Sequence, residues 1–124
     1  MDTEQPLRLC PLIAFDRIVG GKYKLRILWQ LERGIHRYGQ LRASLMKGSL
    51  GQGVTARVLS RELKELQARG LIERKQYDQV PPRVEYRLTD RGKGLLSIID
   101  SIVRWGRTGE HEVILGLREQ PLSI

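Results

Sequence analysis

Apolar side chains recur every three or four positions along the first half of the chain, a spacing that predicts helices with one buried face. Pro11 can begin the first helix because its missing N–H would be unpaired in a first turn, and Gly20 ends it. The predicted helices cover residues 11–19, 22–33, 38–46 and 55–69. The glycine-rich residues 47–53 are predicted to form a flexible turn before the fourth helix.

The second half of the chain begins with a pattern typical of a β-hairpin. Residues 71–77 are predicted to form a strand, and Val84, Tyr86 and Leu88 alternate with charged residues, as in a strand with one buried face. Pro81 and its neighbour Pro82 interrupt regular pairing, which places the tip of the hairpin there.

A last long helix is predicted to follow the hairpin. Thr89 is a good N-cap, and the helix would run from Asp90 to Trp105. Its apolar residues cover more than one narrow stripe, so we expect one side to face the core and another to face a partner. The tail from Arg107 gives no clear pattern. The fold class is therefore mostly α with a small β-hairpin, in one domain over residues 1–124.

Charge favours a polyanionic partner. The chain has 22 Lys and Arg against 14 Asp and Glu, a net charge of +8. Ten of the basic residues and six of the acidic ones lie between Arg57 and Lys93, so half of the excess falls on the fourth helix and the hairpin. Neutralising nucleic-acid phosphates releases counterions, which makes such a concentration of cations typical of DNA-binding surfaces.

The fourth predicted helix has two distinct faces. At 100° per residue its apolar side chains gather on one side, and its polar and basic ones on the other, with Glu62 and Glu65 toward the edges. Arginine can pair with guanine edges, while lysine and hydroxyl groups can contact phosphates. The candidate DNA-binding residues of this helix are Thr55, Arg57, Ser60, Arg61 and Lys64. On the hairpin, Arg83 and Arg87 are the candidates for a phosphate or the minor groove, where a solubilising role is the alternative.

The sequence gives only weak indications of a metal site, a nucleotide site or a catalytic site. His36 and His111 have no metal-ligand spacing, and the segment 110–112 is more consistent with a helix in the tail. Residues 48–53 resemble a phosphate-binding loop, but Val54 stands where that loop needs lysine. We expect no metal, no cofactor and no enzymatic activity. The start of the chain lacks a secretory signal and no segment could span a membrane, so a cytoplasmic protein is expected.

Several segments together resemble one family of bacterial transcription regulators. CPLIAFDRIVGGKYKLRILWQL, RYGQLR, VTARVLSRELKELQARGLIERKQYDQVPPRVEYRLTDRGKGLL and IIDSIVRWG are similar to the HxlR family, over roughly residues 10–106. VPPRVEYRLTDRG is the most specific of these runs. The resemblance implies a winged helix-turn-helix related to the MarR regulators, which acts on double-stranded DNA as a homodimer.

The resemblance also implies roles for particular segments. Residues 55–69 would be the recognition helix and 76–84 the wing, and the first and last helices would form the dimer interface. Residues 47–53 form a longer turn than is usual in the family. Cys10 occupies the position of a cysteine that senses oxidants, quinones or aldehydes in several members. A thiolate at a helix N-terminus can have a lowered pKa. A small buried apolar residue is the alternative role for Cys10.

Sequence-specific regulation of transcription is thus the favoured function. Non-specific nucleoid-type DNA binding and a protein-interaction module on a winged helix are the alternatives, and RNA binding is disfavoured because few aromatic residues are available for stacking. The operator, the target genes, the direction of regulation and any small-molecule effector are not encoded in a readable pattern.

Overall fold

The computed structural model describes residues 8–47 and 53–120. Its elements are α1 (Pro11–Val19), α2 (Lys24–Glu32), α3 (Tyr38–Ser44), α4 (Ala56–Ala68), β1 (Ile72–Tyr77), β2 (Arg83–Leu88), α5 (Asp90–Lys93), α6 (Leu96–Gly106) and α7 (Glu110–Ile114). This mostly helical fold with a hairpin confirms the predicted fold class. Among the described residues, no helix is both long and apolar enough to cross a bilayer.

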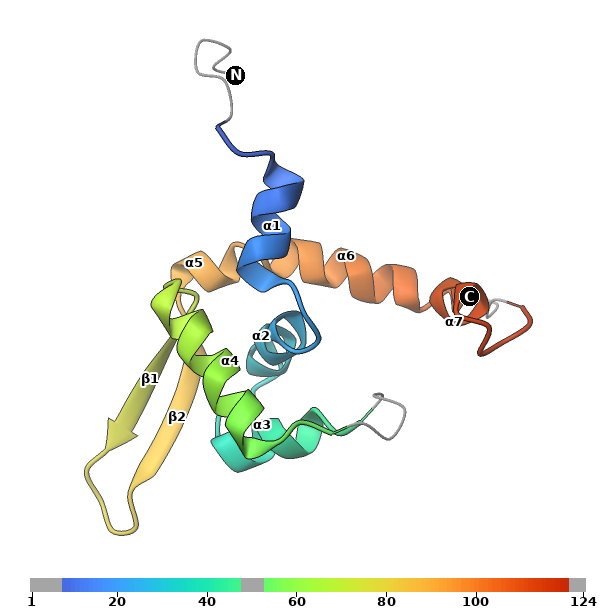
Figure 1. The fold of residues 1–124 in the computed structure, drawn as a ribbon. Helices are drawn as coiled ribbons and strands as arrows, with labels where there is room; N and C mark the ends of the chain where they lie inside the picture. The colour runs from blue at the N-terminus through green and yellow to red at the C-terminus, as the bar shows by residue number, and fades with distance from the viewer. Residues whose placement is uncertain (1–7, 48–52, 121–124) are drawn as a thin grey trace.

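Helix α2 lies at the centre of the molecule. It contacts α3, α4, α6 and β2, so most of the core forms around it. Figure 1 shows α1 above α2, α3 below it, α6 extending to one side toward α7, and α4 and the hairpin on the other side. The side chains buried most completely are Val19, Ile27, Leu28, Leu41, Leu45, Leu59, Leu63 and Leu66.

Capping residues lie at the starts and ends of helices where the sequence predicts them. Pro11 opens α1, and the N–H of Gly20 closes it by donating to the Asp16 carbonyl at 2.7 Å. The Thr55 hydroxyl accepts from the Val58 N–H at 3.2 Å and caps α4. Observed bounds differ from the predicted ones by no more than two residues in α2, α3 and α4, because terminal turns are the least constrained part of a helix.

The hairpin pairs in antiparallel register, with Ile72 opposite Leu88 and Tyr77 opposite Arg83. A feature that the sequence did not reveal lies at its other edge. Arg37 forms an isolated antiparallel bridge with Glu85, and the Tyr86 N–H donates to the His36 carbonyl at 2.9 Å. The segment before α3 therefore covers part of the β2 edge, which would otherwise be open to another strand.

The prediction of a single long helix after Thr89 is wrong, because two helices, α5 and α6, occupy that segment. Backbone N–H groups of Gly94 and Leu95 donate to carbonyls three residues earlier, at 3.2 and 3.1 Å, which tightens the chain before α6 begins. Gly92 packs directly against the backbone between α4 and β1. A Cβ atom on Gly92 would lie 2.1 Å from the Leu71 carbonyl oxygen. The tail from Arg107, which showed no clear sequence pattern, contains α7. Residues 110–112 are helical, as expected.

A buried ion pair joins α2 to α4. The Lys24 ammonium contacts the Glu62 carboxylate, and each side chain is 8% exposed. The same ammonium lies 3.3 Å from the Glu65 carboxylate, which is partly exposed. The expectation that Glu62 lies at the edge of an exposed face is therefore wrong. Its carboxylate points into the protein because a cation from α2, distant in sequence, compensates the cost of burial.

Replacing Lys24 with methionine should strongly destabilise the fold. Lys24→Met leaves the Glu62 charge buried without its main partner, which costs about 3 kcal/mol of unfolding free energy. Urea denaturation measures the loss, with Lys93→Met, a change at an exposed lysine, as the matched control. The double variant Lys24→Met/Glu62→Leu should recover most of the stability. A single variant as stable as the control would contradict this account of the pair.

Candidate nucleic-acid interface

The packing of α4 decides which of its side chains face outward. Leu59, Leu63 and Leu66 are buried against the core, and Glu62 is held among them by Lys24. Because these residues lie on one side of the helix, the opposite side faces away from the core. The helix contacts both α2 and β1, so the core fixes its position relative to the hairpin.

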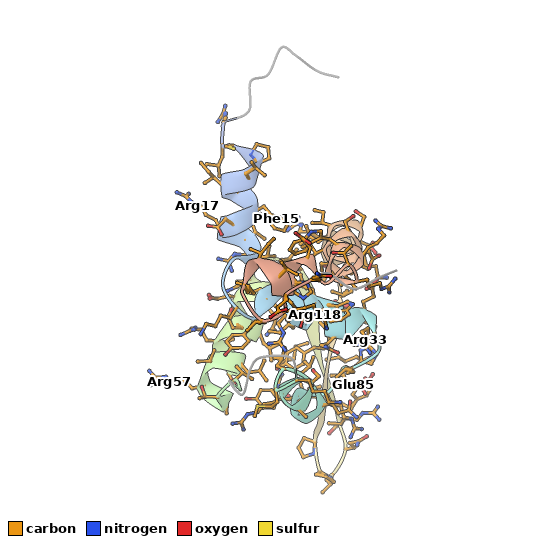
Figure 2. The ribbon with its side chains drawn as sticks, turned by 90° about the vertical axis from the view of Figure 1, so that its right-hand side faces the viewer. Phe15, Arg17, Arg33, Arg57, Glu85 and Arg118 are labelled. Atoms are coloured by element: carbon orange, nitrogen blue, oxygen red, sulfur yellow. The ribbon has the colours of Figure 1, made fainter. Side chains whose placement is uncertain are left out.

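Four predicted DNA-binding residues gather on that free side. A shallow open groove of about 550 Å³ runs along α4. The residues that line it are Arg57, Ser60, Arg61, Lys64, Glu65 and Ala68. Figure 2 shows Arg57 projecting outward from the beginning of α4. The Arg61 side chain is 64% exposed, and its guanidinium lies 3.7 Å from the inward-turned Glu62 carboxylate. This face thus combines guanidinium, ammonium and hydroxyl groups with little competition from acids.

The first turn of α4 is fixed by side chains of α3. The Tyr38 hydroxyl donates to the Ala56 carbonyl at 2.9 Å and lies 3.4 Å from the Ser60 hydroxyl. Ser60 is therefore half-buried and partly engaged, whereas Thr55 is exposed and uses its oxygen as the cap. Thr55 thus lies at the N-terminus of α4, and Ser60 lies one turn further along the helix.

The chain on both sides of the predicted turn is also tied down. The Arg26 guanidinium donates to the carbonyls of Leu45 and Lys47, at 3.1 and 2.7 Å. On the other side, the Arg42 side chain donates to the Val54 carbonyl at 3.1 Å. Residues 48–52, which include most of the predicted turn over residues 47–53 and most of the loop that resembles a phosphate-binding motif, lie outside the described residues.

The two candidate DNA-binding residues of the hairpin have partners within the hairpin. The Arg83 guanidinium lies 3.9 Å from the centre of the Tyr77 ring, and 3.7 Å from the Glu85 carboxylate. Arg87 forms an ion pair with Glu73, the residue opposite it in the register. Neither arginine belongs to the groove on α4. Arg83 and Arg87 are therefore already paired with carboxylates, whereas the arginines and lysine of α4 have fewer competing contacts.

Cys10 lies far from these residues along the chain, at the N-cap of α1, and is exposed. The backbone N–H groups of Ile13 and Leu12, in the first turn of α1, lower the pKa of the Cys10 thiol. The thiolate is favoured because these N–H groups have no helical acceptor in the first turn. The alternative of a buried apolar cysteine is wrong, since the side chain is open to solvent.

The histidines lie in ordinary structural contacts. His36 contacts the Tyr86 carbonyl oxygen through Nδ1 at 3.2 Å, and the His111 ring lies 5.6 Å from that of Trp105. Within residues 8–47 and 53–120, no group of three or more His, Cys, Asp or Glu could hold a metal ion.

Comparisons with known proteins agree with this geometry. The model of the HxlR-like helix-turn-helix family matches residues 18–112. An HTH-type transcriptional regulator of Methanothermobacter thermautotrophicus is 38% identical over 105 residues, which span 84% of this chain and 76% of the relative. YdzF, an HTH-type transcriptional regulator of Bacillus subtilis, is 42% identical over 91 residues, 72% of this chain and 77% of YdzF. The redox regulator HypR in its reduced form superposes with a TM-score of 0.73 at 32% identity, covering 86% of this chain and 99% of HypR.

The lowered pKa of Cys10 predicts faster alkylation at moderate pH. Because the folded protein favours the thiolate, the midpoint of the rate of iodoacetamide reaction against pH should lie below that of the same protein in urea. Mass spectrometry of quenched samples measures the rate. Cys10 is the single cysteine of the chain, so Cys10→Ser gives the background of reaction at other groups. Equal midpoints in buffer and in urea would remove the electrostatic argument for this thiol.

Proposed function

Since the chain belongs to the HxlR-like helix-turn-helix family, whose relatives are transcriptional regulators, we propose that it is a sequence-specific, homodimeric DNA-binding regulator. In this proposal the chain is one winged-helix domain. Helix α4 enters the major groove of double-stranded DNA, and the wing contacts the backbone or the minor groove. The observation that carries the proposal is the exposed face of α4, with Arg57, Arg61 and Lys64 along one groove.

The chemistry of that face suggests how contacts are divided. Arg57 and Arg61 read base edges, because a guanidinium can donate two parallel hydrogen bonds to guanine. Thr55, Ser60 and Lys64 hold phosphates and so fix the register of the helix on the duplex. Arg83 and Arg87 approach the sugar-phosphate backbone or minor groove from the hairpin, where each would exchange an internal partner for DNA. Their contributions should be smaller for that reason.

Dimerisation is supported by apolar surface on α1 and α6. Leu12 and Ile13 of α1 are 80% and 50% exposed, and Ile102 and Trp105 of α6 are 45% and 47% exposed. Large exposed apolar residues on two neighbouring helices are typical of a surface that a second subunit covers. A twofold-symmetric dimer would place its two α4 helices on half-sites about 10 base pairs apart, or a multiple of that distance.

A thiol response is the second part of the proposal. Cys10 is exposed, its pKa is lowered, and it is near the apolar surface of α1. The similar structure HypR is a redox regulator known in oxidised and reduced forms, at 34% and 32% identity to this chain. Oxidation of two Cys10 thiols by diamide, which takes up the two electrons and two protons, would join the subunits by a disulfide and change how the dimer holds DNA.

Selection of genomic fragments by the purified, reduced protein tests the regulatory function directly. Recovery of a few fragments that share an inverted repeat is expected near physiological salt. Uniform recovery that disappears as salt rises would instead indicate phosphate binding without base readout, as in a nucleoid-type protein. No recovery at any salt would favour a protein-interaction module.

Replacing Arg61 should relax sequence preference as well as weaken binding. Arg61→Ala removes a proposed base contact and should cost about 1–3 kcal/mol on the selected fragment, with a smaller loss on unrelated duplex. Lys64→Ala is the matched comparison, because loss of a phosphate contact weakens binding to all sequences and reduces the salt dependence. Fluorescence anisotropy with both duplexes measures the difference. Equal losses for Arg61→Ala on the two duplexes would contradict base reading.

Replacing Cys10 should abolish the response to oxidant. We expect diamide to change the affinity of the native protein for its DNA, and to produce a dimer on non-reducing gels. Cys10→Ser should bind like the reduced native protein with and without diamide. An unchanged affinity of the native protein after full oxidation would refute thiol sensing and leave DNA binding intact.

A further inference from the structure

The tip of the hairpin has an apolar side chain that the fold leaves uncovered. Tyr77 and Arg83 form the last pair of the register, so residues 78–82 connect β1 to β2. All five of these residues are exposed, and Val80, the middle one, is 99% exposed. A valine surrounded by water contributes no packing to its own subunit. Its whole apolar surface is therefore available to another molecule.

The hairpin tip lies at the end of the molecule where α4 begins. Figure 1 shows the tip extending past the first turn of α4, at the end of the molecule opposite α1. The base of the hairpin is held there, because β1 contacts α4 and the Thr89 hydroxyl donates to the Gly70 carbonyl. The bridge between Arg37 and Glu85 holds β2 against the segment before α3. When α4 lies in a major groove, the tip therefore reaches the groove beside it.

The cations of the hairpin are engaged along its strands. The Arg83 guanidinium and the Lys75 ammonium lie 3.9 and 5.1 Å from the centre of the Tyr77 ring. Arg87 is paired with the Glu73 carboxylate. The connection itself, residues 78–82, contains no lysine and no arginine. A contact between the tip and DNA would therefore not come from neutralising a phosphate.

Building on the proposed function, which brings the hairpin to the duplex, we propose that Val80 is an apolar wedge that enters the minor groove beside the bases read by α4. Apolar side chains at such positions separate neighbouring base pairs and bend the duplex. The two prolines that follow Val80 fix φ at their positions and so limit the freedom of the tip. Pyrimidine–purine steps unstack most easily, so the wing prefers them without a hydrogen bond to any base.

Asp78 reports how closely the tip approaches the duplex. It is the single charged residue of the connection, and its carboxylate is repelled by phosphates that lie within about 10 Å, the distance over which salt screens charges. Asp78→Asn should therefore tighten DNA binding if the tip lies against the duplex. The same substitution should have no effect if the tip points into solvent.

Anisotropy titrations of the selected genomic fragment at several salt concentrations test the wedge. Val80→Thr keeps the branched shape and adds a hydroxyl, so it should weaken binding about fivefold. The salt dependence should not change, because no charge is lost. Val80→Ile keeps the apolar contact and should bind like the native protein. Arg57→Gln on α4, the comparison variant, should weaken binding and also reduce the salt dependence.

Base unstacking gives a second readout. 2-Aminopurine is placed in turn at each pyrimidine–purine step that flanks the bases read by α4. Its fluorescence should rise at one step in each half-site with the native protein, and should not rise with Val80→Thr. Replacing that step with a stiff A-tract should weaken the native protein more than it weakens Val80→Thr. Urea denaturation should show equal stability for both proteins, because Val80 packs against nothing in the subunit.

The possible failures have different meanings. If the native protein binds no duplex, the proposed function fails and the wedge fails with it. If Arg57→Gln weakens binding and Val80→Thr does not, the wedge alone is wrong, even where Asp78→Asn shows that the tip is near DNA. Weaker binding by Val80→Thr with no change at any base step would refute insertion. Normal DNA binding by Val80→Thr with loss of regulation in a transcription assay would mean that the tip contacts a protein, which also overturns the wedge.

Discussion

The ion pair between Lys24 and Glu62 fixes the orientation of α4 and therefore decides which of its side chains face outward. A helix packed only by leucines can rotate slightly about its axis at little cost, because apolar contacts have no preferred direction. A buried carboxylate does not have that freedom, since leaving its cation would expose an uncompensated charge to a low dielectric. The pair therefore sets the rotation of α4 against α2. The outward direction of Arg57, Arg61 and Lys64 follows from an interaction on the opposite side of their helix.

Cations in this protein serve two different purposes. On the hairpin, Arg83 and Arg87 have internal carboxylate partners, and Arg83 also covers the Tyr77 ring. Such contacts stiffen a short two-stranded sheet that has little core of its own. On α4, arginine and lysine lie along an open groove and are available to an external polyanion. Net charge alone, which counts all of these residues equally, overstates the number of cations that are free to bind.

Local chemistry made the elements readable from the sequence, whereas contacts between distant residues did not. Thr55 marked the start of α4 because a hydroxyl at that position satisfies a free N–H. Gly92 looked like an ordinary helical residue because its close contact with Leu71 arises only in the folded chain. Lys24 and Glu62 lie 38 residues apart, and no periodicity connects them. The faces of α4 were therefore predicted largely correctly, and the inward turn of one acid was not.

Thr89 connects three elements of the fold: α4, the hairpin and α5. Its hydroxyl donates to the Gly70 carbonyl at 2.5 Å and accepts from the Gly92 N–H at 3.1 Å. One oxygen atom thus joins the end of α4, the base of the hairpin and the first turn of α5, which leads into α6. In the proposed dimer, the separation of the two α4 helices would depend on this junction inside each subunit as well as on the interface between the subunits. A substitution at Thr89, which touches neither DNA nor a partner in this proposal, would then change the operator spacing that the dimer prefers.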